Sequence, residues 1–77
     1  MPDFTVRQGK RYRATISLNI LESFVDNELI AGKFLEAGFA EVSVTGSGGT
    51  RVAKAVWPLE DATAPMPSEI IDIQEIA

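Results

Sequence analysis

The sequence predicts a small α+β domain in which a single-layer, mainly antiparallel sheet of four strands carries one helix on one face. Three observations predict it. Four stretches have the apolar–polar alternation or β-rich composition of strands: 10–18, 41–45, 51–57 and 70–76. A helical pattern lies between the first two stretches, and a proline-containing connection, 58–68, precedes the last. The 77 residues are too few for a second domain, so 1–77 is one domain.

The first strand is predicted from a regular alternation. One face carries Tyr12, Ala14, Ile16 and Leu18, and the other carries Arg11, Arg13, Thr15 and Ser17. Upstream, Phe4 and Val6 also alternate. A turn at Gln8-Gly9 would make them a hairpin partner of this strand, and a single long strand is the alternative.

The helix is expected to start near Ser23 and to end at Gly38. Ser23 and Asp26 resemble a capping box, and Gly38 followed by Phe39 is typical of a C-terminal glycine cap. The residues expected on the side that packs on the sheet are Phe24, Asn27, Ile30, Ala31, Phe34 and Leu35. Val25 and Leu29 lie outside this stripe.

The glycine-rich stretch VTGSGGTR, 44–51, could be a phosphate-binding loop or a hairpin turn. A phosphate loop needs a helix directly after it, because the free N–H groups of the helix hold the anion. Here the strand RVAKAVW follows, so we predict a hairpin with Thr45 and Thr50 as partners around the four-residue turn GSGG.

The element order is β-α-β-β-loop-β, a ferredoxin-like half in which a loop replaces the second helix. A right-handed crossover leaves a gap between the first two strands, the third strand fills this gap, and the fourth pairs with the free edge of the first. For 70–76, a short final helix after Ser68 is the alternative to a strand.

The sheet face away from the helix is the candidate functional surface. The side chains expected there are Arg11, Arg13, Thr15, Ser17, Glu41, Ser43, Thr45, Val52, Lys54, Val56, Ile70, Asp72, Gln74 and Ile76. From these, the residues predicted to contact a partner or ligand are Arg11, Arg13, Thr15, Ser43, Val52, Lys54 and Val56. A bare face of this mixed, locally basic character is usually covered by another molecule.

The composition excludes several classes of function. There are no cysteines or histidines, which removes thiol nucleophiles, zinc sites of the usual ligand set and the commonest general base. No carboxylate or serine pattern indicates catalysis, so we expect no enzyme, no cofactor and no metal site. The net charge of −4 argues against nucleic acid. The absence of a long apolar run argues against a membrane and predicts a soluble, cytoplasmic protein.

Three runs of the chain resemble the SPOR-type peptidoglycan-binding domain: YRATISL (12–18), LIAGKFLEAGFAEVSV (29–44) and TRVAKAVWP (50–58). They carry the family's strand, its helix with a glycine-aromatic pair at Gly38-Phe39, and its arginine-valine strand at Arg51-Val52. The resemblance implies a split β-α-β fold that binds glycan strands on the sheet face. The chain departs from the family's pattern at 59–68, where LEDATAPMPS stands in place of a second helix.

The expected function is therefore that of a small non-enzymatic interaction or assembly module of bacterial or phage type. It would act through its open sheet face or an edge strand, and a domain this small without disulfides favours a homo-oligomer. Another protein is the second expected kind of partner. A glycan-binding module of SPOR-like type is the alternative function.

Overall fold

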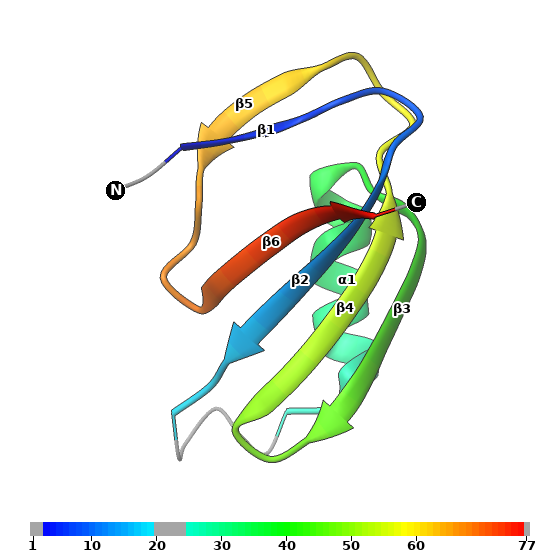
Figure 1. Cartoon of the computed structure of the whole chain (residues 1–77). Coiled ribbons are helices and arrows are strands. Elements are labelled where there is room, and N and C mark those ends of the chain that lie inside the picture. Colours follow the sequence, from blue (N-terminus) through cyan, green and yellow to red (C-terminus); the bar gives the residue numbers. More distant parts are fainter. Residues whose placement is uncertain (1–2, 20–24, 77) are drawn as a thin grey trace.

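The chain folds into two sheets and one helix, described by a computed structural model over residues 3–19 and 25–76. The elements in order are β1 (Asp3–Val6), β2 (Arg11–Ser17), α1 (Asn27–Ala37), β3 (Ala40–Ser47), β4 (Thr50–Val56), β5 (Ala62–Pro65) and β6 (Ile70–Ile76). The larger sheet has the order β3-β4-β2-β6, its neighbouring strands are antiparallel, and α1 lies on one face (Figure 1). The predicted fold class and strand order are confirmed, and the alternative of a final helix is wrong.

The N-terminal strand does not pair with β2, so both predictions for Phe4 and Val6 are wrong. Strand β2 is already paired on both edges, by β4 and by β6, and has no free edge to offer. The chain turns at Gly9, where φ is +80°, and β1 pairs instead with β5. These two strands form a separate ribbon across one end of the larger sheet (Figure 1). The predicted connection 58–68 therefore contains a strand.

The hairpin between β3 and β4 is tighter than predicted. Ser47 pairs with Thr50 across a two-residue turn, Gly48-Gly49, and Thr45 pairs with Val52 rather than with Thr50. The strand can extend to the turn because Gly46 adopts φ +102°, a conformation that other residues rarely adopt. The observed partner of Thr45, Val52, lies two residues after the predicted partner, Thr50. Because side chains alternate between the faces of a strand with a period of two, this shift leaves the side chains of β4 on the predicted faces.

A β-bulge changes the predicted faces of β6. Thr15 pairs with Asp72 but Ile16 pairs with Ile70, which leaves Ile71 as the extra residue and 61% exposed. Because a bulge shifts the alternation by one residue, Ile70 packs against the core rather than on the outer face. The prediction that Ile70 faces outward is wrong for this reason.

The helix begins later than predicted. Asp26 precedes it in an extended conformation and forms no side-chain cap hydrogen bond, so it does not occupy the third helical position that a capping box requires. Ser23 lies outside the described residues. At the other end Gly38 has φ +114°, and its N–H and that of Phe39 donate to carbonyls of the last turn, as predicted. Leu35 is 55% exposed, contrary to prediction, because α1 covers the sheet with the side that carries Ile30.

The core has two apolar clusters, one at each end of the sheet's inner face. Ala14, Ile16, Ile30 and Ala53 form the first, between α1 and the sheet. Val6, Tyr12 and Trp57 form the second, where the ribbon meets the sheet. Ala14 of β2 and Ala53 of β4 lie in the same cluster as Ile30 of α1.

Arg51 is the single buried charged side chain among the described residues, 4% exposed on the helix side of β4. Its Nη1 donates to Asn27 Oδ1 at 2.7 Å and its Nε donates to the Gly48 carbonyl at 3.1 Å. Asn27 Nδ2 in turn donates to the Gly46 carbonyl at 3.1 Å. These bonds attach the start of α1 to the tip of the β3–β4 hairpin.

Replacing Arg51 with methionine is expected to lower the free energy of unfolding by about 1.5–3 kcal/mol, because charge-assisted hydrogen bonds in a buried site are lost. Lys54→Met is the matched control, since it removes a cation from an exposed position of the same strand, and we expect a change within about 0.5 kcal/mol. Urea denaturation followed by circular dichroism measures both. If Arg51→Met and Lys54→Met lower the free energy of unfolding equally, the hydrogen bonds of Arg51 do not stabilise the fold.

Candidate functional site

The outer face of the larger sheet is a grid of side chains in rows that cross the strands. The middle row is Ser43, Lys54, Arg13 and Gln74, one residue from each strand in the order β3, β4, β2 and β6. The row on the hairpin side is Thr45, Val52, Thr15 and Asp72, and the row on the ribbon side includes Val56, Arg11 and Ile76. The face is therefore polar and basic at its centre, and its apolar side chains, Val52, Val56 and Ile76, lie in the two flanking rows.

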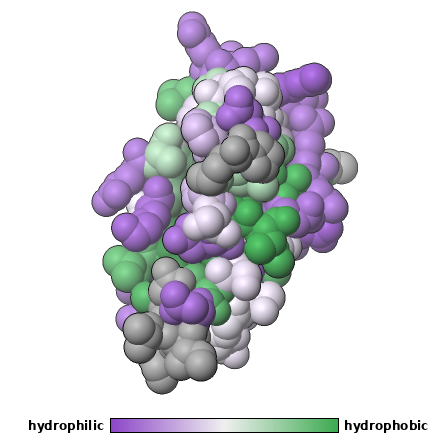
Figure 2. Space-filling model, turned by 90° about the vertical axis from the view of Figure 1, so that its left-hand side faces the viewer, coloured by the Kyte–Doolittle hydropathy of each residue, from purple (hydrophilic) through white to green (hydrophobic). Residues whose placement is uncertain are grey.

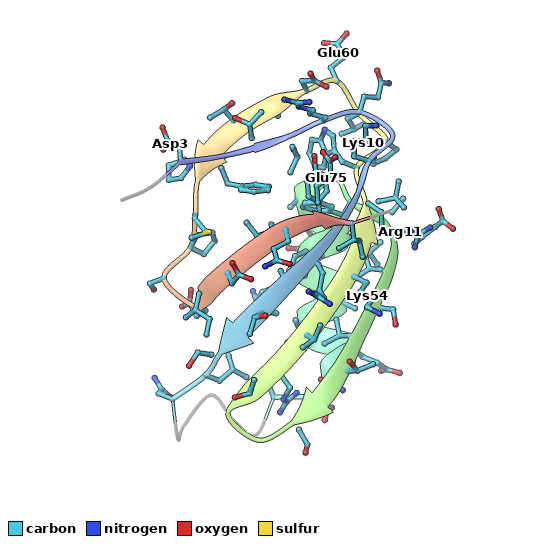
Figure 3. All side chains as sticks on the ribbon, in the orientation of Figure 1. Asp3, Lys10, Arg11, Lys54, Glu60 and Glu75 are labelled. Atoms are coloured by element: carbon cyan, nitrogen blue, oxygen red, sulfur yellow. The ribbon has the colours of Figure 1, made fainter. Side chains whose placement is uncertain are left out.

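Two like charges stand directly opposite each other in the middle row. Arg13 and Lys54 are Cα partners on adjacent antiparallel strands, an arrangement that lowers stability. Arg13 Nη2 donates to Gln74 Oε1 at 3.0 Å. Because the Gln74 amide is neutral, it does not neutralise the positive charge of Arg13. Arg11 lies two residues from Arg13 and adds a third cation on the same side of β2. Figure 3 shows Arg11 and Lys54 extending away from the sheet.

The predicted contact residues all lie in these rows. Arg11, Arg13, Ser43 and Lys54 are exposed, while Thr15, Val52 and Val56 are half-buried among their neighbours. The alternation of β2 and β4 brings them together, because strands paired in this register place equivalent side chains on one face. Glu41, also predicted on this face, sits at an irregularity of β3 with φ +51°.

Acidic clusters and aromatic rings are both missing from the described part of the outer rows. Within residues 3–19 and 25–76, no three acidic side chains are clustered closely enough to hold a metal ion. The described aromatic rings lie away from these rows, on the helix side and in the ribbon, where Phe39 and Trp57 are in edge contact with centroids 4.9 Å apart. The same described ranges contain no helix of the length and apolarity that a membrane span requires.

A second surface was not predicted from the sequence. On the helix side, a hollow of about 650 Å³ lies between α1, the β2–β6 half of the sheet and the β1–β5 ribbon. The alternation of Phe4 with Val6 was visible in the sequence, whereas 58–68 was predicted as a connection. Only the pairing of β1 with β5 sets Ala62 and Ala64 over the sheet. The hollow and the outer face lie on opposite sides of the same strands.

The fold and the outer face define a small α+β domain with an open, basic sheet face. Comparison with protein-family models, with curated proteins and with solved structures gives no match.

Proposed function

We propose that this chain is a small non-enzymatic protein-interaction module that binds an acidic, extended segment of a partner on the outer face of the sheet. The observation that supports it is the middle row, where Arg13 and Lys54 are opposite one another with no acidic residue in the row. A carboxylate placed between them would relieve the repulsion of the two cations.

The distribution of charge in the chain agrees with this proposal. The net charge is −4, yet the centre of the outer face is basic. Acidic residues such as Asp3 and Glu60 lie at the ribbon end of the molecule (Figure 3). Complementary potentials steer a partner and set its orientation, so an acidic segment would be guided to the sheet face.

The charges of the outer face also favour one arrangement of a second copy over another. A two-fold face-to-face dimer with its axis along the strands would set Lys54 against Arg13 of the other copy, which is unfavourable. A second copy fits better if it offers acidic residues from its ribbon end. A glycan on this face would find no ring among the described residues to pack against, so the protein partner is favoured.

Replacing Lys54 with glutamate is expected to weaken binding of a fluorescein-labelled octaglutamate peptide by about tenfold or more, because the substitution puts an anion opposite Arg13 and beside the bound peptide. Fluorescence anisotropy at low salt measures the affinity. Lys33→Glu makes the same charge change on α1 and is expected to leave binding within about twofold. Equal losses in the two variants would show that only net charge matters and would contradict a site on this face.

Light scattering over a range of protein concentrations tests the second copy as the partner. A dimer that dissociates in Lys54→Glu but not in Lys33→Glu would make the partner another copy of the chain. A monomer at all concentrations that still binds the acidic peptide would assign the face to a different protein. A dimer unaffected by Lys54→Glu would contradict self-association through this face.

A further inference from the structure

Within residues 3–19 and 25–76, the helix side of the sheet is only partly covered. Helix α1 lies along β3 and β4, while the half of the sheet formed by β2 and β6 faces the β1–β5 ribbon across the hollow. Its volume of about 650 Å³ falls in the range of about 300–1,000 Å³ that is typical of small-molecule sites. On the side of the molecule seen in Figure 2, hydrophobic side chains lie at the surface among hydrophilic ones.

The lining of the hollow is almost entirely apolar. The sheet supplies the floor with Ile16, Ile70 and Ile73, α1 supplies one wall, and the ribbon supplies the other. Among the described lining residues, only Lys33 on α1 and Glu69 before β6 carry a charge. Sites of this composition bind an apolar ligand and orient it by a few polar groups.

The β5 side of the ribbon leaves space in the hollow because its inward side chains are small, while β1 contributes Phe4 and Val6 to the lining. Ala62 and Ala64 of β5 face the hollow, whereas Thr63 faces away and its hydroxyl is hydrogen-bonded to that of Thr5 at 2.7 Å. Larger side chains at the two alanines would fill the space and gain dispersion contacts with the floor. As far as residues 3–19 and 25–76 are concerned, this apolar surface is available to another molecule.

The size of the hollow argues for a slender occupant. A helix about 10–12 Å in diameter would enter the hollow only in part, because little more than one complete turn of it would fill about 650 Å³. A single aliphatic chain is much thinner and can lie along the floor over its full length. Lys33 and Glu69 are the charged groups of the described lining. Lys33 is exposed and no carboxylate of the described residues forms an ion pair with it, whereas Glu69 is half-buried, so we place the headgroup at Lys33 and expect it to be anionic.

We propose that the hollow binds a single-chain aliphatic carboxylate. The chain lies over Ile16 and Ile73 between α1 and the ribbon, and the carboxylate pairs with the Lys33 ammonium. This site is independent of the outer sheet face and uses none of its residues.

Trp57 provides a direct measurement, because it is the only tryptophan of the chain and it lines the hollow. Titration of the intact protein with octanoate, decanoate and dodecanoate, each below its micelle concentration, is expected to give a saturable change in its fluorescence. The affinity should rise about fifteenfold for each two methylenes until the hollow is full. Dodecanol is expected to bind more weakly than dodecanoate, and dodecylamine more weakly still.

Two pairs of variants locate the ligand. Ala64→Phe is expected to abolish dodecanoate binding by filling the hollow, and Thr63→Phe, on the other side of the same strand, is expected to retain it. Lys33→Gln should weaken dodecanoate by about two- to fivefold and leave dodecanol unchanged, whereas Lys54→Gln should change neither. Circular dichroism verifies that each variant is folded, and Ala62→Leu replaces Ala64→Phe if the latter is not.

Several results would overturn the proposal. They are the absence of a saturable response up to the solubility limit, equal binding of dodecylamine and dodecanoate, and equal losses in Ala64→Phe and Thr63→Phe. Tighter binding of an amphipathic 18-residue leucine-lysine peptide, in competition with dodecanoate, would assign the hollow to a helix instead.

Discussion

Replacing Trp57 with alanine is expected to lower the free energy of unfolding by about 3–5 kcal/mol, enough to leave the chain largely unfolded at 25 °C. Trp57 is 7% exposed and joins three parts of the fold. Its ring packs with Val6 and Tyr12 and makes an edge contact with Phe39, and its Nε1 donates to the Glu60 carbonyl at 2.8 Å. Truncation would open a cavity between the sheet, the ribbon and the end of α1.

Circular dichroism in urea is the suitable measurement, since the variant has no tryptophan to follow by fluorescence. Trp57→Phe keeps a ring but loses the hydrogen bond, and about 1–2 kcal/mol is expected. Leu35→Ala truncates an exposed apolar side chain, with a change expected within about 0.5 kcal/mol. A loss in Trp57→Ala no larger than that in Leu35→Ala would show that the second core cluster does not stabilise the fold.

Replacing Gly46 with alanine is expected to lower the free energy of unfolding by about 3 kcal/mol or more. A Cβ at this position would lie 2.8 Å from the Thr50 carbonyl oxygen and 3.3 Å from the Arg51 Cα, and φ is +102°. Both neighbours belong to the paired strand, so relief would require the two strands to separate. The loss would also displace the Gly46 carbonyl that accepts from Asn27.

Gly48→Ala separates conformational strain from the steric clash. Gly48 has φ +68° and no atom within 4 Å of the position of a Cβ, so only the left-handed conformation is penalised, by about 1 kcal/mol. Urea denaturation of both variants compares the two costs. If both variants lose the same free energy of unfolding, the β3–β4 hairpin must adjust its backbone to accommodate the added methyl group at Gly46.

The alternation of β2 and β4 was sufficient to predict the two faces of these strands, and the right-handed crossover predicted the strand order. The buried residues Tyr12, Ala14 and Ala53 and the exposed residues Arg13 and Lys54 lie on the sides that a period of two assigns them. The candidate face was predicted for the same reason. Its use by a partner remains a proposal.

Features that depend on pairing between distant segments were not predictable. The bulge at Ile71 arises where the Ser17 N–H donates to the Glu69 carbonyl, a bond that no local pattern indicates. The strand Ala62–Pro65 has weak β propensity and lies among prolines, so its sequence indicates a loop. It is a strand because it pairs with β1, which cannot pair with β2 since both edges of β2 are already taken.

The ribbon also affects the order in which the chain can fold. Its hydrogen-bonded threonines, Thr5 and Thr63, are 58 residues apart in the sequence, so closing this loop early would carry a large entropic cost. The cost falls once the sheet has formed, because the Gly9 N–H then donates to the Trp57 carbonyl and Trp57 N–H to that of Lys10, which brings both strands of the ribbon to one place. We therefore expect the ribbon to form after β2 and β4 have paired, so that the wall it gives the hollow is completed after this part of the sheet.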